Sequence, residues 1–147
     1  MKILIDTNII LEIILRRECF DVANHLLTTL QEGEHKLYIT SGGFYGLLFT
    51  TDKYLRKVLE MENPRRTDTV RSLMTQVLNV VDVAGQDKQA LIRGIHDMGF
   101  KDLEDSCQHQ AAQAEQCDYL LTFNVKDYTG STIPVLSPQE FMSRLLW

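Results

Sequence analysis

The sequence predicts an α/β protein, a three-layer α/β/α sandwich in which one parallel sheet of four to five strands lies between two layers of helices. Short apolar runs of strand length alternate along the chain with longer amphipathic runs of helical length. The short runs are apolar throughout, which is typical of strands buried on both faces. The 147 residues, 44% of them apolar, suffice for one ordinary hydrophobic core. We therefore expect one domain that spans residues 1–147.

The first half of the chain alternates two predicted strands with four predicted helices. The strands are the apolar runs Lys2–Asp6 and Leu37–Thr40. Thr7-Asn8 can cap the helix that follows the first strand. Amphipathic segments predict helices after Asn8, over Phe20–Gln31, after Ser41-Gly42-Gly43 to about Met61, and from Pro64 to about Thr75.

The second half is predicted to contain two or three strands and three helices. The strands are Val77–Val83, which is β-branched and apolar, Tyr119–Phe123 and, as a fifth, Ile133–Leu136. The helices are Gln86–Met98, which Gly99 is placed to end, Asp102 to about Gln116, and a last one that begins at Ser137. Ser137-Pro138-Gln139-Glu140 combines a capping box with proline at the first helical position, which makes it the strongest local signal in the chain.

The charge balance argues against a strongly basic nucleic-acid coat and against a polybasic membrane binder. The chain carries 15 Lys and Arg residues against 20 Asp and Glu residues, a formal net charge of −5. Residues 1–51 carry 4 basic and 6 acidic side chains (−2), residues 52–71 carry 6 and 4 (+2), and residues 72–147 carry 5 and 10 (−5). The surplus of acid therefore lies in the second half, and the positive stretch is residues 52–71.

Neither a membrane segment nor a zinc or disulfide framework is expected. The apolar N-terminus is interrupted at Asp6, too soon for a signal-peptide core, and no apolar run approaches the roughly 18 residues of a membrane span. Cys19, Cys107 and Cys117 are odd in number and lack metal-knuckle spacing, and the histidines show no HExxH or HxH pattern. We therefore expect reduced core thiols in a cytoplasmic protein.

Polar side chains follow the predicted strands at one edge of the sheet. Asp6 ends the first strand, Asn124 follows the fourth with Asp127 close behind, and Asp105 lies in the first turn of the helix that leads into the fourth. The carboxyl ends of parallel strands meet at the edge where ligands bind. Mg²⁺ and Mn²⁺ prefer oxygen ligands, and such an ion can activate water and neutralise charge in phosphodiester hydrolysis. Asp6, Asp105, Asn124 and Asp127 fit that demand as metal ligands.

Each of these acids also has a structural interpretation. Asp6 could cap the first helix, and Asp105 could be a first-turn acid that interacts with the helix dipole, with Asp102 as the cap. Glu104 could be a solvated neighbour or could hold a metal-bound water, and Asp127 could be a loop residue. The side chains expected to hydrogen-bond around the site are Thr7, Asn8 and Thr122.

Four segments, in order along the chain, resemble the PIN-domain ribonucleases. Ile3–Leu11 (ILIDTNIIL) resembles the opening strand of that family with its Asp-Thr-Asn, and Asp102–Ser106 (DLEDS) resembles the segment that carries its helical metal acid. Asp118–Tyr128 (DYLLTFNVKDY) resembles the late strand and the loop after it, and Ile133–Phe141 (IPVLSPQEF) resembles the closing strand and helix. The resemblance spans nearly the whole chain.

The resemblance implies an α/β/α fold and a divalent ion, Mg²⁺ or Mn²⁺, held by acids. It implies that Asp6 and Asp105 are the catalytic acids of an endoribonuclease that acts on single-stranded or structured RNA, as in the VapC-type toxins of toxin–antitoxin pairs. It also implies a homodimer and an antitoxin protein as partners.

The basic stretch at residues 52–71 has more than one interpretation. Its side chains could form a solvated face, a track for RNA phosphates beside the acidic cleft, or a docking surface for an acidic partner. A phosphate track would use Lys53, Arg56, Lys57, Arg65 and Arg66. The apolar neighbours Leu47, Leu48, Phe49, Tyr54 and Leu55 are expected mostly in the core, with any excess forming a dimer face.

Two positions depart from the family pattern. Gly46 lies where the family usually carries a glutamate on the helix after the second strand, and Asp52 is six residues on, about 9 Å along the helix axis and on another face. Phe123 lies where a basic residue is frequent. We therefore carry two hypotheses: a metal-dependent ribonuclease, attenuated by the missing acid, and a catalytically degenerate PIN domain that binds RNA or a protein.

Overall fold

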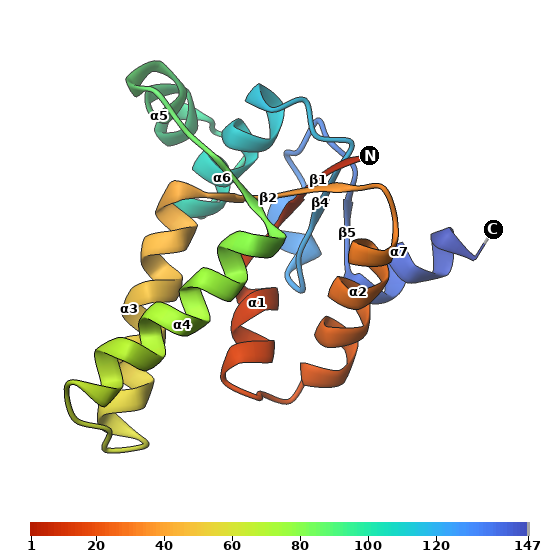
Figure 1. The fold of residues 1–147 in the computed structure, drawn as a ribbon. Coiled ribbons are helices and arrows are strands. Elements are labelled where there is room, and N and C mark those ends of the chain that lie inside the picture. Colours follow the sequence, from red (N-terminus) through yellow and green to blue (C-terminus); the bar gives the residue numbers. More distant parts are fainter. Residues whose placement is uncertain (147) are drawn as a thin grey trace.

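The computed structural model describes residues 1–146 and places five parallel strands in one sheet (Figure 1). The strands are β1 (Lys2–Ile5), β2 (Lys36–Thr40), β3 (Asp82–Ala84), β4 (Tyr119–Leu121) and β5 (Val135–Leu136). Their order across the sheet is β3-β2-β1-β4-β5, so the N-terminal strand lies in the middle. Every neighbouring pair is parallel, which confirms the predicted sheet with the fifth strand included.

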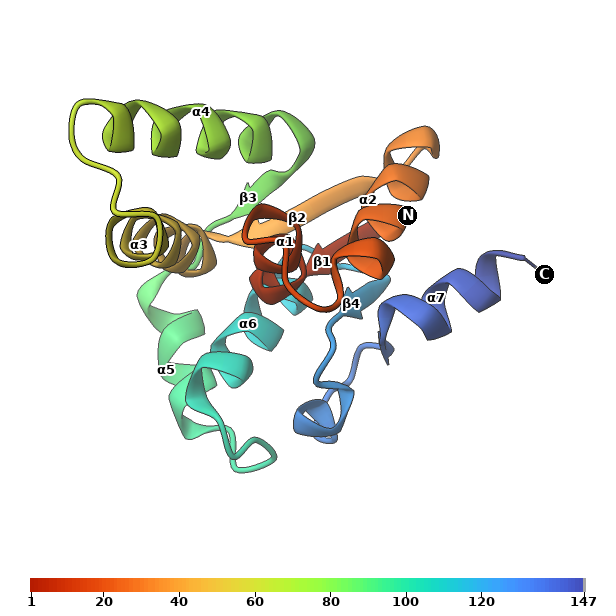
Figure 2. The ribbon, with the colours of Figure 1, turned by 90° about the horizontal axis from the view of Figure 1, so that it is seen from below.

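Helices cover both faces of this sheet, as Figure 2 shows with α4 on one side of the strands and α5 and α6 on the other. The helices are α1 (Thr7–Ile14), α2 (Phe20–Glu32), α3 (Ser41–Lys57), α4 (Arg65–Val80), α5 (Lys88–His96), α6 (Leu103–Ala114) and α7 (Pro138–Leu145), and a 3₁₀ turn, η1 (Val125–Tyr128), follows β4.

The central strand β1 contributes to two separate cores because successive side chains of a strand point to opposite faces. Ile3 and Ile5 belong to the larger core, which α1, α2, α3, α4 and α7 complete. Leu4 belongs to a smaller core with Phe100 and Tyr128, against α6. All three β1 residues are fully buried, and the three-layer α/β/α sandwich is thereby confirmed.

The third strand is shorter and later than predicted. Val77–Val80 form the last turn of α4, and β3 consists of residues 82–84 alone. Val70, Met74 and Val77 are buried at spacings of four and three residues, which continues the apolar stripe of a helix that packs on the larger core. Because β-branched residues at helical spacing satisfy both patterns, the β-rich composition of this segment was misleading.

The segment after α5 also differs from the prediction. Helix α5 ends at His96, with Asp97 at the C-cap, and Gly99 does not end it. The Gly99 N–H donates to Asp97 Oδ1 at 2.9 Å. A Cβ atom on Gly130 would lie 2.6 Å from the Gly99 carbonyl oxygen, so this pair lets two loops approach closely.

The predicted capping box of the last helix is present. Glu140 N–H donates to Ser137 Oγ, and Ser137 N–H donates to Glu140 Oε2 at 2.8 Å. Cys19, Cys107 and Cys117 are free thiols. Among residues 1–146, no helix combines the length and the apolar character that crossing a membrane requires.

Candidate active site

Asp6 lies at the carboxyl end of the central strand, where β1 passes into α1. Its backbone N–H donates to Leu121 O of β4 at 2.9 Å, so the sheet fixes its position. Its carboxylate accepts two hydrogen bonds, from Thr122 Oγ1 (2.7 Å to Oδ2) and from the Asn8 backbone N–H (3.1 Å to Oδ1). The side chain therefore caps α1 as well as facing the sheet edge. Only 6% of Asp6 is exposed, and this burial raises the pKa of its carboxyl group.

Asp105 reaches the same edge from the first turn of α6. Asp102 caps that helix by accepting the Asp105 N–H at 3.0 Å, as its structural interpretation predicts. Asp105 Oδ1 accepts a hydrogen bond of 3.0 Å from the Tyr128 hydroxyl, which itself accepts one of 2.6 Å from Gln108 Nε2. Tyr128 is not among the predicted site residues, although its position in the loop after β4 was a usable signal.

The two carboxylates influence one another. Partial burial raises the pKa of Asp105 to about 6, and the negative charges of Asp102, Asp6 and Asp127 add to this rise, while the hydrogen bond from Tyr128 opposes it. Burial and the charges of Asp6 and Asp105 together raise the pKa of Tyr128, which stays a neutral donor. Several acids thus lie close together at one edge of the sheet, and none of them forms an ion pair within residues 1–146. Such an arrangement is typical of functional sites.

The other predicted site residues differ in their hydrogen bonds and in their exposure. The Asn124 backbone N–H donates to Thr122 Oγ1 at 3.1 Å, and the residue is exposed at the start of η1. Asp127 is exposed within η1, close enough for its charge to act on Asp105. Asn8 acts through its backbone. Thr7 packs against α3, where a Cβ on Gly43 would lie 2.7 Å from Thr7 Cγ2, and Glu104 is exposed.

Gly46 faces open space on α3. A Cβ atom added there would meet no heavy atom within 4 Å, so a longer side chain would fit. The nearest downstream acid, Asp52, is engaged elsewhere, because its Oδ1 accepts a 3.1 Å bond from Arg66 Nε. Asp52 therefore does not replace the missing acid.

The oxygen-donor set fits a hard divalent cation only as a minimal site. Within residues 1–146, no group of three or more His, Cys, Asp or Glu side chains is arranged to hold a metal ion. Mg²⁺ is commonly bound through one or two carboxylates, with water and substrate phosphates completing its coordination. Asp6 and Asp105 would supply those carboxylates, and Asn124 and Asp127 lie on the adjoining turn.

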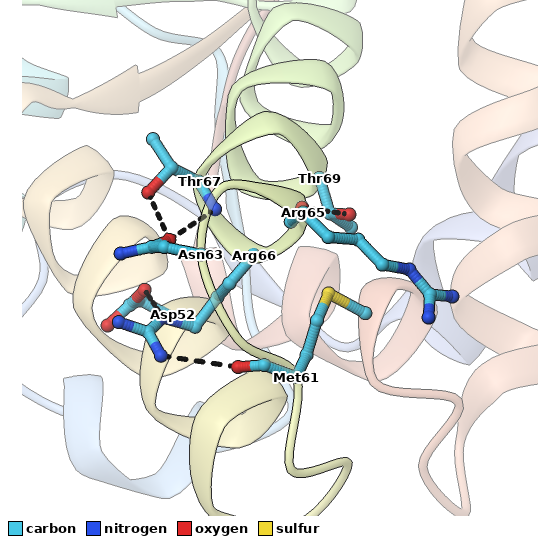
Figure 3. A network of polar contacts seen from close by, with 7 residues as sticks. All are labelled: Asp52, Met61, Asn63, Arg65, Arg66, Thr67 and Thr69. Atoms are coloured by element: carbon cyan, nitrogen blue, oxygen red, sulfur yellow. Dashed lines mark hydrogen bonds and ion pairs between the residues drawn. The ribbon is translucent and has the colours of Figure 1, made fainter.

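The basic side chains of residues 52–71 gather at the far end of the α3–α4 hairpin. Helix α3 rises about 1.5 Å per residue, so Lys57 lies about 24 Å along the axis from Ser41 at the sheet edge. Figure 3 shows that Arg66 is bound within the hairpin, where it donates to Asp52 and to Met61 O (3.2 Å), while the Arg65 side chain extends to the other side. Lys53 lies over the Phe49 ring, 6.0 Å from its centroid.

Two of the apolar neighbours of this segment are more exposed than expected. Leu47 and Leu55 are buried, but 65% of Phe49 is accessible and Leu48 is exposed, because they lie on the outer face of α3.

The sequence matches a known protein family. The sequence model of the PIN domain matches residues 2–126. Ribonuclease VapC1 of Aquifex aeolicus (strain VF5) is 33% identical over 73 residues, which are 47% of this chain and 50% of that protein, so the chain spans half the length of this curated relative.

Solved structures share the fold over nearly their whole length. A chain of VapBC2 from Rickettsia felis, bound to a DNA fragment from its promoter, superposes with a TM-score of 0.68 at 16% identity, covering 93% of this chain and 98% of that one. A chain of FitAB bound to IR36 DNA gives a TM-score of 0.70 at 14% identity, covering 92% and 94%. FitAcB from Neisseria gonorrhoeae gives a TM-score of 0.67 at 17% identity, covering 93% of this chain and 98% of that one. Because the family model matches most of this chain, residues 2–126, the chain belongs to the PIN domain family.

Proposed function

We propose that this protein is a metal-dependent endoribonuclease and the toxin of a toxin–antitoxin pair. The observation that carries the proposal is the pair of carboxylates, Asp6 and Asp105, that two separate elements bring to one edge of the sheet with each oriented by a hydroxyl donor. The similarity to Ribonuclease VapC1 supports RNA as the substrate. Free thiols and the charge balance agree with a cytoplasmic location.

The chain's own groups would position the reactants. Thr122 and the Asn8 N–H fix the Asp6 carboxylate, and Tyr128 fixes Asp105, so both hold their oxygens toward the edge where a scissile phosphate would bind. Asp6 and Asp105 would hold the divalent ion, with Asn124 and Asp127 beside them. Such an ion supplies charge neutralisation and an activated water to phosphodiester hydrolysis.

A specific observation favours the alternative of a degenerate PIN domain. Position 46 lacks a carboxylate and faces open space, so the site has less negative charge than the family pattern provides. A binding module would retain RNA or protein association without turnover.

RNA cleavage with Mg²⁺ or Mn²⁺ separates the two functions. We expect the wild-type protein to cleave RNA, and Asp6→Asn to lose at least about 100-fold in rate, because the amide keeps the helix cap but not the charge that holds the ion. Asp82→Asn, on the exposed edge strand β3, is the matched control and should cleave normally. Wild-type protein that is inert on varied RNAs, together with an inert Gly46→Glu variant, would leave the binding module as the function.

A homodimer is supported by the large apolar side chains that α3 and α5 expose. They are Tyr45, Leu48 and Phe49 on α3, and Leu91, Ile92 and Ile95 on α5. Exposure of such side chains to water is unfavourable, and a second copy of the chain would cover them in an isologous contact. Light scattering of the wild-type protein should give twice the chain mass, and Phe49→Lys combined with Ile95→Lys should give a monomer.

An antitoxin partner is supported by a different surface. A cavity of about 460 Å³ opens between α1, α2 and α4, lined mainly by apolar side chains such as Ile13, Leu27, Leu73 and Val80. The similar solved structures VapBC2 and FitAB are complexes bound to DNA, which supports a protein partner for this chain as well. If a small reading frame lies beside the gene, its co-expression with this protein should yield a complex that Leu27→Lys disrupts.

A further inference from the structure

A polar cleft lies between the α5–α6 loop and η1, the two segments that contact Asp105 through Asp102 and Tyr128. Its volume is about 650 Å³, and it is lined by Met98, Gly99, Lys101, Asp102, Lys126, Asp127 and Thr129. Both walls belong to the segments that hold Asp105, because Asp102 caps the helix that carries Asp105, and Tyr128 lies between Asp127 and Thr129. The cleft is therefore built from the same two segments that hold Asp105.

The two walls of the cleft are held at a fixed separation. The backbones of Gly99 and Gly130 touch at a distance that leaves no room for a Cβ atom on Gly130. Phe100 packs edge-on against Tyr128, with ring centroids 5.8 Å apart. Its ring is tilted against that of His109, with the two centroids 5.0 Å apart. These contacts within the protein hold the two walls in place, so a ligand would bind without first having to order them.

One lysine stands on each wall, Lys101 on the loop and Lys126 on η1, and both are exposed. The ion pairs found within residues 1–146 are Asp52–Arg66 and Asp68–Arg71, so neither ammonium group is neutralised by a direct carboxylate contact there. Of the two acids in the cleft, Asp102 directs Oδ1 to the N-terminus of α6, whose positive dipole end offsets part of its charge.

These lysines are better placed for substrate than the basic hairpin. Lys53 and Lys57 lie about 18 Å and 24 Å along α3 from the sheet edge, whereas Lys101 and Lys126 line the cleft that adjoins Asp105.

We propose that this cleft is the subsite for the RNA backbone next to the scissile bond, with Lys101 and Lys126 donating hydrogen bonds from opposite walls to phosphodiester oxygens. The inference rests on the proposed ribonuclease function for the identity of the ligand. It assigns to these two lysines the phosphate-binding role that was one of the three interpretations of the basic stretch at residues 52–71.

Binding of RNA without turnover tests the subsite. The probe is a short, fluorescently labelled single-stranded RNA in EDTA, and its affinity for the full chain is measured by anisotropy over a range of salt concentrations. Lys101→Gln combined with Lys126→Gln should weaken binding about tenfold and lower the salt dependence by about 0.7 per lysine in log–log slope, and the Lys→Arg pair should restore both.

The matched control removes two exposed positive charges that lie outside the cleft. Lys36→Gln combined with Arg144→Gln changes the exposed start of β2 and the end of α7, and should leave affinity and slope at the wild-type values. An equal loss in this control would mean that bulk charge alone attracts RNA, and the subsite would be wrong.

Cleavage measured in parallel distinguishes the subsite from the nuclease function. If the wild-type protein cleaves RNA and the cleft variant binds and cleaves like wild type, the subsite is overturned and the nuclease stands. If the cleft variant loses binding but wild type never cleaves, the subsite stands and the nuclease function fails. A wild-type protein that does not bind RNA overturns the subsite.

Discussion

The charged side chains at the sheet edge and those in the α3–α4 hairpin have opposite kinds of neighbour. At the sheet edge, Asp6 and Asp105 each accept a hydrogen bond from one hydroxyl group and have further acids nearby. Neither forms an ion pair with a basic side chain within residues 1–146. In the hairpin, Asp52 and Arg66 pair directly and tie α3 to α4 (Figure 3). The hairpin charges thus stabilise the fold, whereas burial and mutual repulsion make the edge charges unfavourable for it. We propose that a bound divalent cation offsets this cost. The predictions below test this contrast.

The largest effect is expected at Thr122, which holds the buried Asp6 carboxylate. Thr122→Val keeps the shape but removes the donor to Asp6 Oδ2 and the acceptor of the Asn124 N–H, so the free energy of unfolding should fall by about 2 kcal/mol and cleavage should slow. Thr75→Val on the exposed face of α4, where the hydroxyl bonds only Arg71 O, is the control and should change stability little. Equal losses in chemical denaturation would show that the Thr122 bond is not special.

A carboxylate restored at position 46 should raise the affinity of the sheet-edge site for a divalent metal ion. Gly46→Glu places a carboxylate where the built Cβ has open space, and metal affinity should rise about tenfold, about 1.4 kcal/mol, by calorimetry. Gly42→Glu adds the same charge one turn earlier in α3, also into open space, and should not reproduce the gain. Identical affinities in the two variants would mean that position 46 does not face the ion.

The crowded acids should make the metal-free protein less stable as the pH rises. The folded pKa of Asp105, about 6, is above its ordinary value of 3.8, so its stabilising contribution is complete below pH 3.8 and is lost as the pH rises to about 6. Asp105→Asn should therefore be about 1 kcal/mol more stable than wild type at pH 7 in EDTA, with the advantage shrinking toward pH 4. An advantage that does not vary with pH would contradict this origin.

The smallest effect is expected in the hairpin. Arg66→Gln breaks a partly exposed ion pair and should lower the free energy of unfolding by about 0.5 kcal/mol, less in high salt. Asp52→Asn should give a similar loss, and the double variant should lose no more than either single change. Additive losses in a double-mutant cycle would show that the two side chains are not coupled.

Much of the fold followed from local patterns, while much of the site depended on long-range packing. The all-apolar runs at β1 and β4 and the capping box at Ser137 predict their elements because their signals are local. The prediction of a strand at Val77–Val80 was wrong because these residues are of types common in strands, while the spacing of the buried ones is that of a helix.

The partners of the site residues were harder to predict. The approach of Tyr128 to Asp105 joins residues 23 apart through packing on Phe100. The cleft between Lys101 and Lys126 requires the contact of Gly99 with Gly130, and no spacing in the sequence encodes that contact. The placement of Asp6 and Asp105 at one edge, by contrast, followed from the parallel arrangement of the strands and from the helix that leads into β4.

Manganese binding tests the central claim, that Asp6 and Asp105 form one cation site, most directly. Electron paramagnetic resonance of Mn²⁺ titrated with the protein should show a bound ion for wild type and for Asp82→Asn. The same titration should show only the free ion for Asp6→Asn and for Asp105→Asn, because each removes one of the two carboxylates. Unchanged binding in either of these two variants, or no binding by the wild-type protein, would contradict the account.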